Sequence, residues 1–171
     1  NPYAVTKLDD ENLAIKYAKM GVRIIGLRYF NVFGEKQSST YAGVIKKFVK
    51  KVRNNEAPII NGDGQQTRDF VYVGDVVNAN ILAMNSNVDH EFFNIGTSTT
   101  ITVLELANLI IKSFNLSLKP IHGPELPGDV KITKADISQV EKMLNWKPKI
   151  RIEEWLKNTI TAGTNLDLLT E

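Results

Sequence analysis

The stretch Gly21-Val22-Arg23-Ile24-Ile25-Gly26-Leu27-Arg28-Tyr29-Phe30 decides the fold class of this chain. Residues 4–20, immediately before it, repeat apolar side chains at helical spacing and predict a helix. Gly21 is a natural C-terminal cap for that helix, and residues 22–30 predict a largely buried strand. A helix, a short glycine turn and an apolar strand form the second half of a βαβ unit, so the sequence predicts an α/β fold with a parallel sheet.

The helix before this strand opens on Asn1-Pro2-Tyr3-Ala4-Val5-Thr6-Lys7. Tyr3 and Lys7 are four residues apart, so both side chains project from one helix face. An ammonium beside a phenol favours the phenolate form, which makes these residues a candidate proton-transfer pair. A Tyr and a Lys at this spacing are also typical of an ordinary solvated helix face, and the pair alone does not separate the two interpretations.

Two polar side chains border the predicted strands. Asn31 follows the first strand at once, where ligands of open α/β sheets bind, so its amide either contacts a ligand or closes a turn. Arg68 stands at the entrance of a later strand, where a guanidinium either grips a diphosphate or pairs with Asp69 or another surface acid. The segment 61–64 predicts a hairpin turn rather than a phosphate loop, because no helix follows it closely.

The remaining periodicities predict alternating helices and short strands without an internal repeat. Asp75 is the expected N-cap of one helix, and Thr102 with Glu105 forms the expected capping box of the next. The predicted helices cover residues 41–54, 75–83, 102–111, 136–144 and 152–162, and the predicted strands cover residues 58–60, 70–73, 92–96 and 118–121.

Composition excludes several classes of protein. The net charge of +2, from 21 basic and 19 acidic residues, does not suggest a nucleic-acid binder, and we interpret the basic run at 46–53 as a solvated helix face. Without cysteine there is no disulfide, thiolate zinc site or cysteine nucleophile. His90 and His122 are too few and too scattered to predict a metal site. No apolar run reaches about 18 residues and no signal peptide opens the chain, so we expect a cytoplasmic protein without membrane contact.

Five motifs in order identify a resemblance that covers nearly the whole chain. Together they resemble the nucleotide-sugar epimerases and dehydratases of the extended short-chain dehydrogenase/reductase family. The motifs are Tyr3-x-x-x-Lys7, Leu27–Gly34, Gly62–Val73, Phe93–Thr97, and a last motif that starts at Pro127–Val130 and is followed by the segments Ala135–Ile137 and Leu144–Pro148.

The resemblance implies a role for each matching position. Tyr3 would be the general base that removes a proton from the sugar 4-hydroxyl while hydride passes from C4 to NAD. Lys7 would hold the nicotinamide ribose and favour the phenolate, and Phe30 would contact the cofactor. The remaining matches would bind the nucleotide sugar: Asn31 and Arg68 the diphosphate, Gly43, Val44, Ile59, Ile60 and Asn61 the uracil or thymine site, and Asp129 a further part of the substrate.

The resemblance also implies how the chain is divided. Residues 1–34 and about 67–96 would complete a Rossmann-like parallel-sheet domain, while about 35–66 and 97–171 would form a small mixed α/β substrate domain. The glycine-rich dinucleotide fingerprint and the Ser or Thr expected upstream of Tyr3 do not occur in the sequence. We therefore expect the C-terminal half of such an enzyme, inactive alone, with NAD bound mainly by the other half. Family members usually form homodimers through helices that include the Tyr–Lys helix.

The favoured activity is NAD-dependent epimerisation at C4 of a UDP-glucose, UDP-galactose or UDP-N-acetylglucosamine type substrate, because the Arg28–Asn31 strand end suits epimerases. A nucleotide-sugar 4,6-dehydratase or UDP-glucuronate decarboxylase stays open, since residues beside the upstream Ser or Thr separate these classes. A non-catalytic, nucleotide-sugar-binding or dimerising fragment is the alternative from a different class. One departure concerns the nucleotide: Leu126 stands where the family usually has an arginine.

Overall fold

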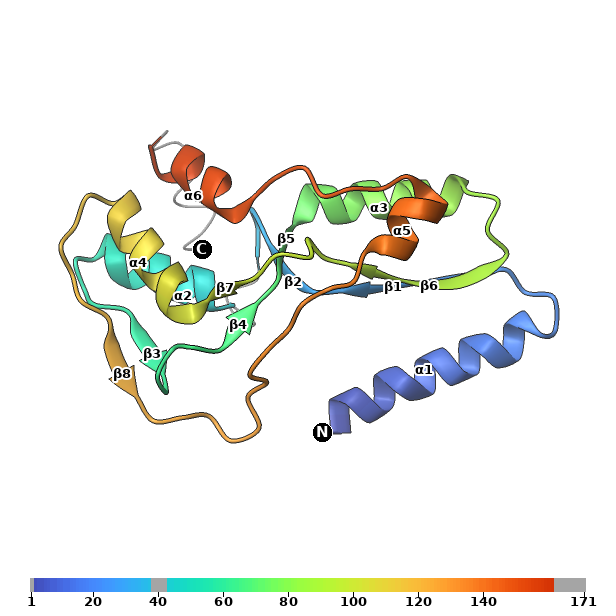
Figure 1. Ribbon diagram of the computed structural model, residues 1–171, viewed down its shortest axis with the longest axis horizontal. Coiled ribbons are helices and arrows are strands. Elements are labelled where there is room, and N and C mark those ends of the chain that lie inside the picture. Colours follow the sequence, from blue (N-terminus) through green and yellow to red (C-terminus); the bar gives the residue numbers. More distant parts are fainter. Residues whose placement is uncertain (1, 38–42, 162–171) are drawn as a thin grey trace.

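A parallel strand pair lies between two helical layers in the larger part of the molecule (Figure 1). The computed structural model describes residues 2–37 and 43–161. Strand β1 (Ile24–Tyr29) pairs with β6 (His90–Ile95). Helix α1 (Pro2–Ala18) covers one face of this pair, and helices α3 (Val73–Asn85) and α5 (Ser138–Leu144) cover the other face. The predicted α/β class with parallel strands is confirmed.

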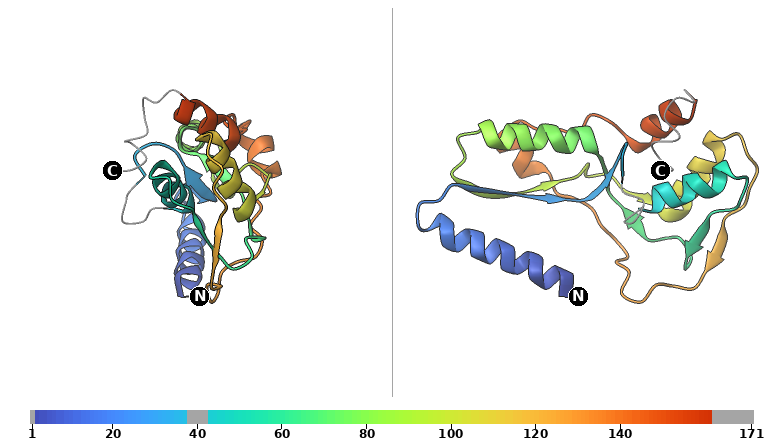
Figure 2. Two further views of the ribbon diagram at one scale, coloured as in Figure 1. Left: turned by 90° about the vertical axis from the view of Figure 1, so that its left-hand side faces the viewer. Right: turned by 180° about the vertical axis from the view of Figure 1, so that it is seen from behind.

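A second parallel pair forms a separate two-stranded sheet toward the smaller part of the molecule. Strand β2 (Asn31–Phe33) follows β1 after one residue and pairs with β5 (Phe70–Tyr72). Beyond it lie α2 (Val44–Arg53), α4 (Val103–Ser113) and α6 (Ile152–Thr161), seen from the side and from behind in Figure 2. The remaining elements are the parallel pair β3 (Ile59–Asn61) with β8 (Ile121–Gly123), and the antiparallel pair β4 (Thr67–Arg68) with β7 (Ile101–Thr102).

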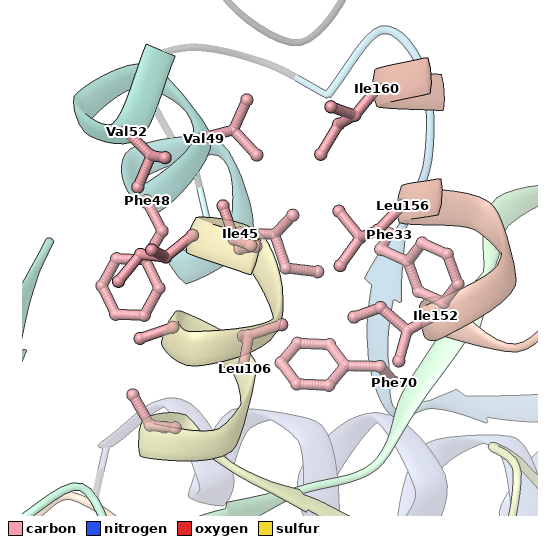
Figure 3. Close-up of a cluster of buried hydrophobic side chains, with 14 of the residues drawn as sticks. Phe33, Ile45, Phe48, Val49, Val52, Phe70, Leu106, Ile152, Leu156 and Ile160 are labelled. Carbon is pink, nitrogen blue, oxygen red and sulfur yellow. The ribbon is translucent and has the colours of Figure 1, made fainter. Parts of the chain in front are cut away.

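Two hydrophobic clusters hold these parts together. The first fills the space between α2, α4 and α6 and includes Phe48, Leu106 and Leu156 (Figure 3). The second lies under α3 and α5 and includes Phe93 and the fully buried Trp146. The two-domain boundaries predicted from the sequence stay a prediction. No helix within residues 2–37 and 43–161 combines the length and apolar character that a bilayer span requires.

Several predicted element boundaries are corrected by the structure. The capping box of Thr102 and Glu105 at α4 is confirmed. Helix α3 begins at Val73, so Asp75 is not its N-cap; instead, the Asp75 carboxylate accepts backbone hydrogen bonds from Lys149 and Ile150, at 2.9 and 3.0 Å. The predicted 118–121 strand begins only at Ile121, and the predicted 136–144 helix begins at Ser138.

The turn at residues 61–64 does not connect a hairpin. The strand before it, β3, pairs with β8, while the strand after it, β4, pairs with β7. Gly62 and Gly64 both have positive φ, which is the conformation that glycine permits at a sharp turn. The predicted hairpin is therefore wrong, because partners distant in sequence take the hydrogen-bonding edges of both strands. Residues 38–42 and 162–171, including the predicted helix start at 41 and the last residue of the 152–162 helix, lie outside the described residues.

Helix α1 has the weakest attachment of the long helices. None of its residues is buried, and the predicted apolar stripe is exposed, with Leu8 at 58% and Ile15 at 40%. Arg28 on β1 reaches α1 through two hydrogen bonds of 2.6 and 2.7 Å to the Glu11 carboxylate. Strand β1 pairs only with β6 within the described part of the chain, so its outer edge faces away from any described strand.

We expect Arg28→Met to loosen α1 selectively. Partly exposed ion pairs contribute about 0.5–1 kcal/mol, which corresponds to roughly two- to fivefold faster amide exchange.

The Arg28 hydrogen bond lowers the pKa of Glu11 below its ordinary value of 4.5. A lowered carboxyl pKa stabilises the folded form above the unfolded value and loses this effect as pH falls. In the unsubstituted chain, exchange in α1 should therefore accelerate as pH drops below about 4.5, once corrected for intrinsic rates.

Hydrogen exchange followed by mass spectrometry checks this expectation. Lys51→Met is the matched control, because it removes the 2.8 Å pair of Lys51 with Glu56 in a different part of the molecule. Equal exchange of α1 in Arg28→Met and in the unsubstituted chain would contradict the role assigned to the ion pair.

Candidate functional site

A groove of about 780 Å³ runs between α2, the edge strands β3 and β4, and the loop that leads to Asp129. Chain segments far apart in the sequence build its walls. The residues predicted to bind substrate that line this groove are Asn31, Gly43, Val44, Ile59, Asn61, Arg68 and Asp129, and Leu126 lines it as well.

Ile60 is the one predicted substrate residue whose side chain does not reach the groove. Side chains alternate along a strand, so Ile59 and Asn61 line the groove while Ile60 points the opposite way. Ile60 is fully buried in the first hydrophobic cluster. Its side chain supports the wall from behind, which the resemblance alone did not separate from direct contact.

Arg68 is a cation of the groove that three hydrogen bonds hold in place. Its Nη1 donates to the carbonyl oxygens of Thr67 and Val130 at 2.8 and 2.5 Å, and its Nη2 lies 2.5 Å from the Asp129 carboxylate. The side chain is only 13% exposed. Its acidic partner is therefore Asp129, not its sequence neighbour Asp69, and both members of the ion pair face the groove.

Asn31 is fixed by the main chain of the neighbouring strand. Its backbone N–H and its side-chain Nδ2 both donate to the carbonyl oxygen of Asp69, at 3.1 and 2.9 Å. Asn31 opens strand β2 and does not close a turn. The amide therefore stands in the wall of the groove with a fixed orientation.

The basic run of α2 contributes to the site in a way that the sequence interpretation missed. Lys46 is buried and donates to the Gln37 carbonyl at 3.0 Å, while Lys47, Lys50 and Lys51 line the groove. Lys51 pairs with Glu56 at 2.8 Å. The interpretation as a solvated face is wrong for Lys46, whereas Lys47 and Lys50 are exposed and line the groove as well. The signal for the groove was the i, i+3, i+7 spacing from Val44, which puts Lys47 and Lys51 on the stripe that faces it.

Tyr3 and Lys7 lie outside this groove, on the exposed first turns of α1. The Lys7 ammonium is 5.9 Å from the Tyr3 ring centroid. It also pairs with Asp10 at 2.7 Å, and the hydrogen bond and charge of that carboxylate raise the pKa of Lys7. Helix α1 runs antiparallel to β1, so its first turn lies level with the carboxyl end of that strand (Figure 1). The predicted pair is therefore adjacent and at the sheet edge where ligands bind.

Phe30 links the two strand pairs. Its backbone N–H donates to the Ile95 carbonyl at 3.0 Å, and its half-buried ring packs against the second hydrophobic cluster. Phe30 thus occupies the carboxyl end of β1 but does not line the groove.

The groove combines three kinds of surface that suit one type of ligand. Arg68 and the lysines of α2 provide positive charge, Asn31, Asn61 and Gln66 provide amides, and apolar side chains fill the remaining wall. A ligand with an anionic group, a hydrogen-bonding group and an apolar or aromatic part matches this arrangement. The apolar wall includes Val44, Ile45, Phe48, Phe70 and Val103.

Comparison with known proteins gives matches across nearly the whole chain. Residues 1–96 match the NAD dependent epimerase/dehydratase family. A Methanocaldococcus jannaschii protein named "Putative UDP-glucose 4-epimerase" is 40% identical over 167 residues, which cover 96% of this chain and 54% of that protein. The UDP-N-acetyl-alpha-D-glucosaminuronate decarboxylase of Bacillus cytotoxicus is 34% identical, over 92% of this chain and 51% of the relative.

A solved structure gives the same result for the fold. The UDP-glucose 4-epimerase of Thermotoga maritima, crystallised with UDP-glucose, superposes with a TM-score of 0.88 at 36% sequence identity. The match covers 94% of this chain and 52% of that one. This chain therefore spans about half the length of the curated relatives and of the solved structure that it matches.

Proposed function

This chain belongs to the NAD-dependent epimerase/dehydratase family, and on that premise we propose that it provides the catalytic base and the substrate groove of a nucleotide-sugar 4-epimerase of the UDP-glucose/UDP-galactose type. The observation that carries the proposal is the groove itself. It brings Asn31, Arg68 and Asp129 from three distant segments into one lining together with Val44 and Ile59. The epimerase relatives support the choice of reaction.

The groups that this chain offers to NAD fit such a cofactor in their chemistry. A ribose presents neighbouring hydroxyls, and the Lys7 ammonium and Tyr3 phenol are exposed donors on one helix face. In this proposal Lys7 binds the nicotinamide ribose, with Phe30 as a further contact. Bound NAD supplies reversible hydride acceptance at the sugar C4. The relatives' greater length supports the view that most of the cofactor site belongs to the other half of the parent protein.

The proposed work of the protein side chains is binding and proton transfer. Arg68 and Asn31 hold the diphosphate, because a guanidinium and an amide donate hydrogen bonds to phosphate oxygens. Tyr3 takes the proton of the sugar 4-hydroxyl as that carbon is oxidised, and returns it after the 4-keto sugar has rotated. The Lys7 ammonium stands beside this base, 5.9 Å from the centroid of the Tyr3 ring.

A second candidate reaction is decarboxylation of a nucleotide uronate. The 34% identity to a UDP-N-acetyl-alpha-D-glucosaminuronate decarboxylase favours keeping it. Decarboxylases, 4,6-dehydratases and epimerases share the oxidation at C4, so Tyr3 and Lys7 would serve all three. The homodimer, the cytoplasmic location and the domain boundaries stay predictions within this proposal.

In the full-length protein, Tyr3→Phe should reduce turnover by at least about 10²–10⁴-fold, because the general base is lost. Substrate affinity should change little. Assays with UDP-glucose, dTDP-glucose and UDP-glucuronate separate the reactions: a dehydratase product loses water and a decarboxylase product loses carbon dioxide, both seen by mass. An epimer keeps the mass of the substrate and is detected by chromatographic separation of the two sugars. Full activity of Tyr3→Phe would rule out the assigned base.

The isolated chain should bind UDP and fail to bind NAD. The groove residues all belong to this chain, whereas Tyr3, Lys7 and Phe30 cover only a small part of a dinucleotide. Isothermal titration with each ligand measures the difference. NAD binding comparable to that of UDP would contradict the assignment of the cofactor to the other half, and would also count against a non-catalytic fragment.

Leu126→Arg should raise the affinity for UDP by about three- to tenfold, because it adds a charge-assisted hydrogen bond at an exposed wall of the groove. Leu126 is 54% exposed, so the new guanidinium can be accommodated. Ile132→Arg is the matched control, since this equally apolar, exposed residue does not line the groove. A gain of equal size in both variants would point to non-specific attraction.

A further inference from the structure

A buried carboxylate follows Arg68 directly in the sequence. Asp69 has no exposed surface. Its Oδ1 accepts from the backbone N–H and the hydroxyl of Thr97 at 2.8 and 2.7 Å, and its Oδ2 accepts from the backbone N–H groups of Ser98 and Ala135 at 3.0 Å each. None of these donors carries a positive charge. Four hydrogen bonds offset the free-energy cost of burying the carboxylate and fix both donor segments against it.

The main chain of the same residue holds a wall of the groove. The Asp69 carbonyl accepts both N–H groups that orient Asn31. Arg68 and Phe70, on either side of Asp69 in the sequence, also line the groove. The orientation of these three residues therefore depends on where residue 69 is anchored.

The segment that positions the Arg68 guanidinium is tied to the same carboxylate. Asp129 and the carbonyl of Val130 accept hydrogen bonds from Arg68. This segment then runs beside Thr67, which donates to the Lys131 carbonyl at 2.8 Å. It reaches Asp69 through the N–H of Ala135. One carboxylate thus fastens the strand that carries Arg68 and the segment that carries its acceptors.

The turn that wraps Asp69 has little freedom to move. Ser98 has a φ of 57°, an unfavourable value for a residue with a side chain. A Cβ added at Gly96 would lie 3.0 Å from Asp69 Oδ2 and 2.5 Å from the Ala135 Cβ. The turn is held in this conformation by the hydrogen bonds that it donates to the carboxylate.

We propose that Asp69 is a positioning residue for the diphosphate of the nucleotide sugar, acting through Arg68 and Asn31. The inference rests on the proposed function of the groove. Asp69 touches no ligand itself, since it is buried behind the wall. Its carboxylate sets the distance between the guanidinium and the amide that would share the phosphate oxygens.

Asp69→Asn tests this role with almost no change in shape. The amide group would meet two of the four donors with N–H groups of its own, so those hydrogen bonds are lost. We expect the isolated chain to lose about tenfold in UDP affinity and less than about twofold in uridine affinity, because uridine lacks the phosphates. A general loss of structure would instead reduce the affinities for UDP and for uridine equally, and that result would overturn the proposal.

A double-mutant cycle shows whether Asp69 acts through Arg68. Arg68→Met should also lose about tenfold for UDP alone. If the two residues form one unit, the double variant loses about ten- to twentyfold, well short of the roughly hundredfold that independent effects would give. Fully multiplicative losses would overturn the proposal. If Arg68→Met itself leaves UDP binding unchanged, the proposed function of the groove fails, and the next measurement still decides the role of Asp69.

That measurement needs no ligand. The Arg68 Nε–Hε resonance, assigned by its loss in Arg68→Met, should move or broaden in Asp69→Asn as the guanidinium loses its fixed partners. An unchanged resonance would overturn the proposal. Thr97→Val is a milder variant, since it removes one hydroxyl donor, and it should shift the resonance in the same direction. If Asp69→Asn does not fold, Thr97→Val decides in the same way. Asp63→Asn, in an exposed turn, is the control and should change nothing.

Discussion

The pairing of β2 with β5 is the constraint on which the rest of the molecule depends. It sets Asn31 opposite Phe70, and Val32 opposite Val71. Because side chains alternate across a strand, Phe70 enters the first hydrophobic cluster while Val71 enters the second. Two short strands therefore belong to both cores at once. They also bring Asn31 beside Arg68 and Asp69, so the same pairing that joins the two parts of the molecule builds the wall of the groove.

Before any ligand arrives, the Arg68 side chain is already ordered. Three hydrogen bonds, to two carbonyl groups and to Asp129, hold its guanidinium. A ligand that binds there does not need to order a long flexible side chain, which reduces the entropy lost on binding. The same arrangement favours ligands that form hydrogen bonds with both members of the pair, with oxygens that accept from Arg68 and a hydroxyl that donates to Asp129. A nucleotide diphosphate with its ribose has both groups.

The sequence predicted what depends on local pattern and missed what depends on distant partners. Helical periodicity and the Thr102–Glu105 box gave α4 correctly, and the family resemblance pointed to most of the groove. Lys46 was misinterpreted because helical spacing does not reveal which face another segment covers. The role of Asp69 has no local signature, since its donors lie 28 to 66 residues away. The hairpin prediction was wrong for the same reason, because β3 pairs with β8, which is distant in the sequence.

The outer edge of β1 has a consequence for the behaviour of this chain in solution. Within the described residues, that edge has no strand beside it. Unpaired N–H and C=O groups along a strand are a template for adding a strand from another molecule. The Arg28 side chain on this strand is held by the Glu11 carboxylate of α1, so its charge is paired and does not repel an identical edge. Self-association through β1 would therefore increase with protein concentration.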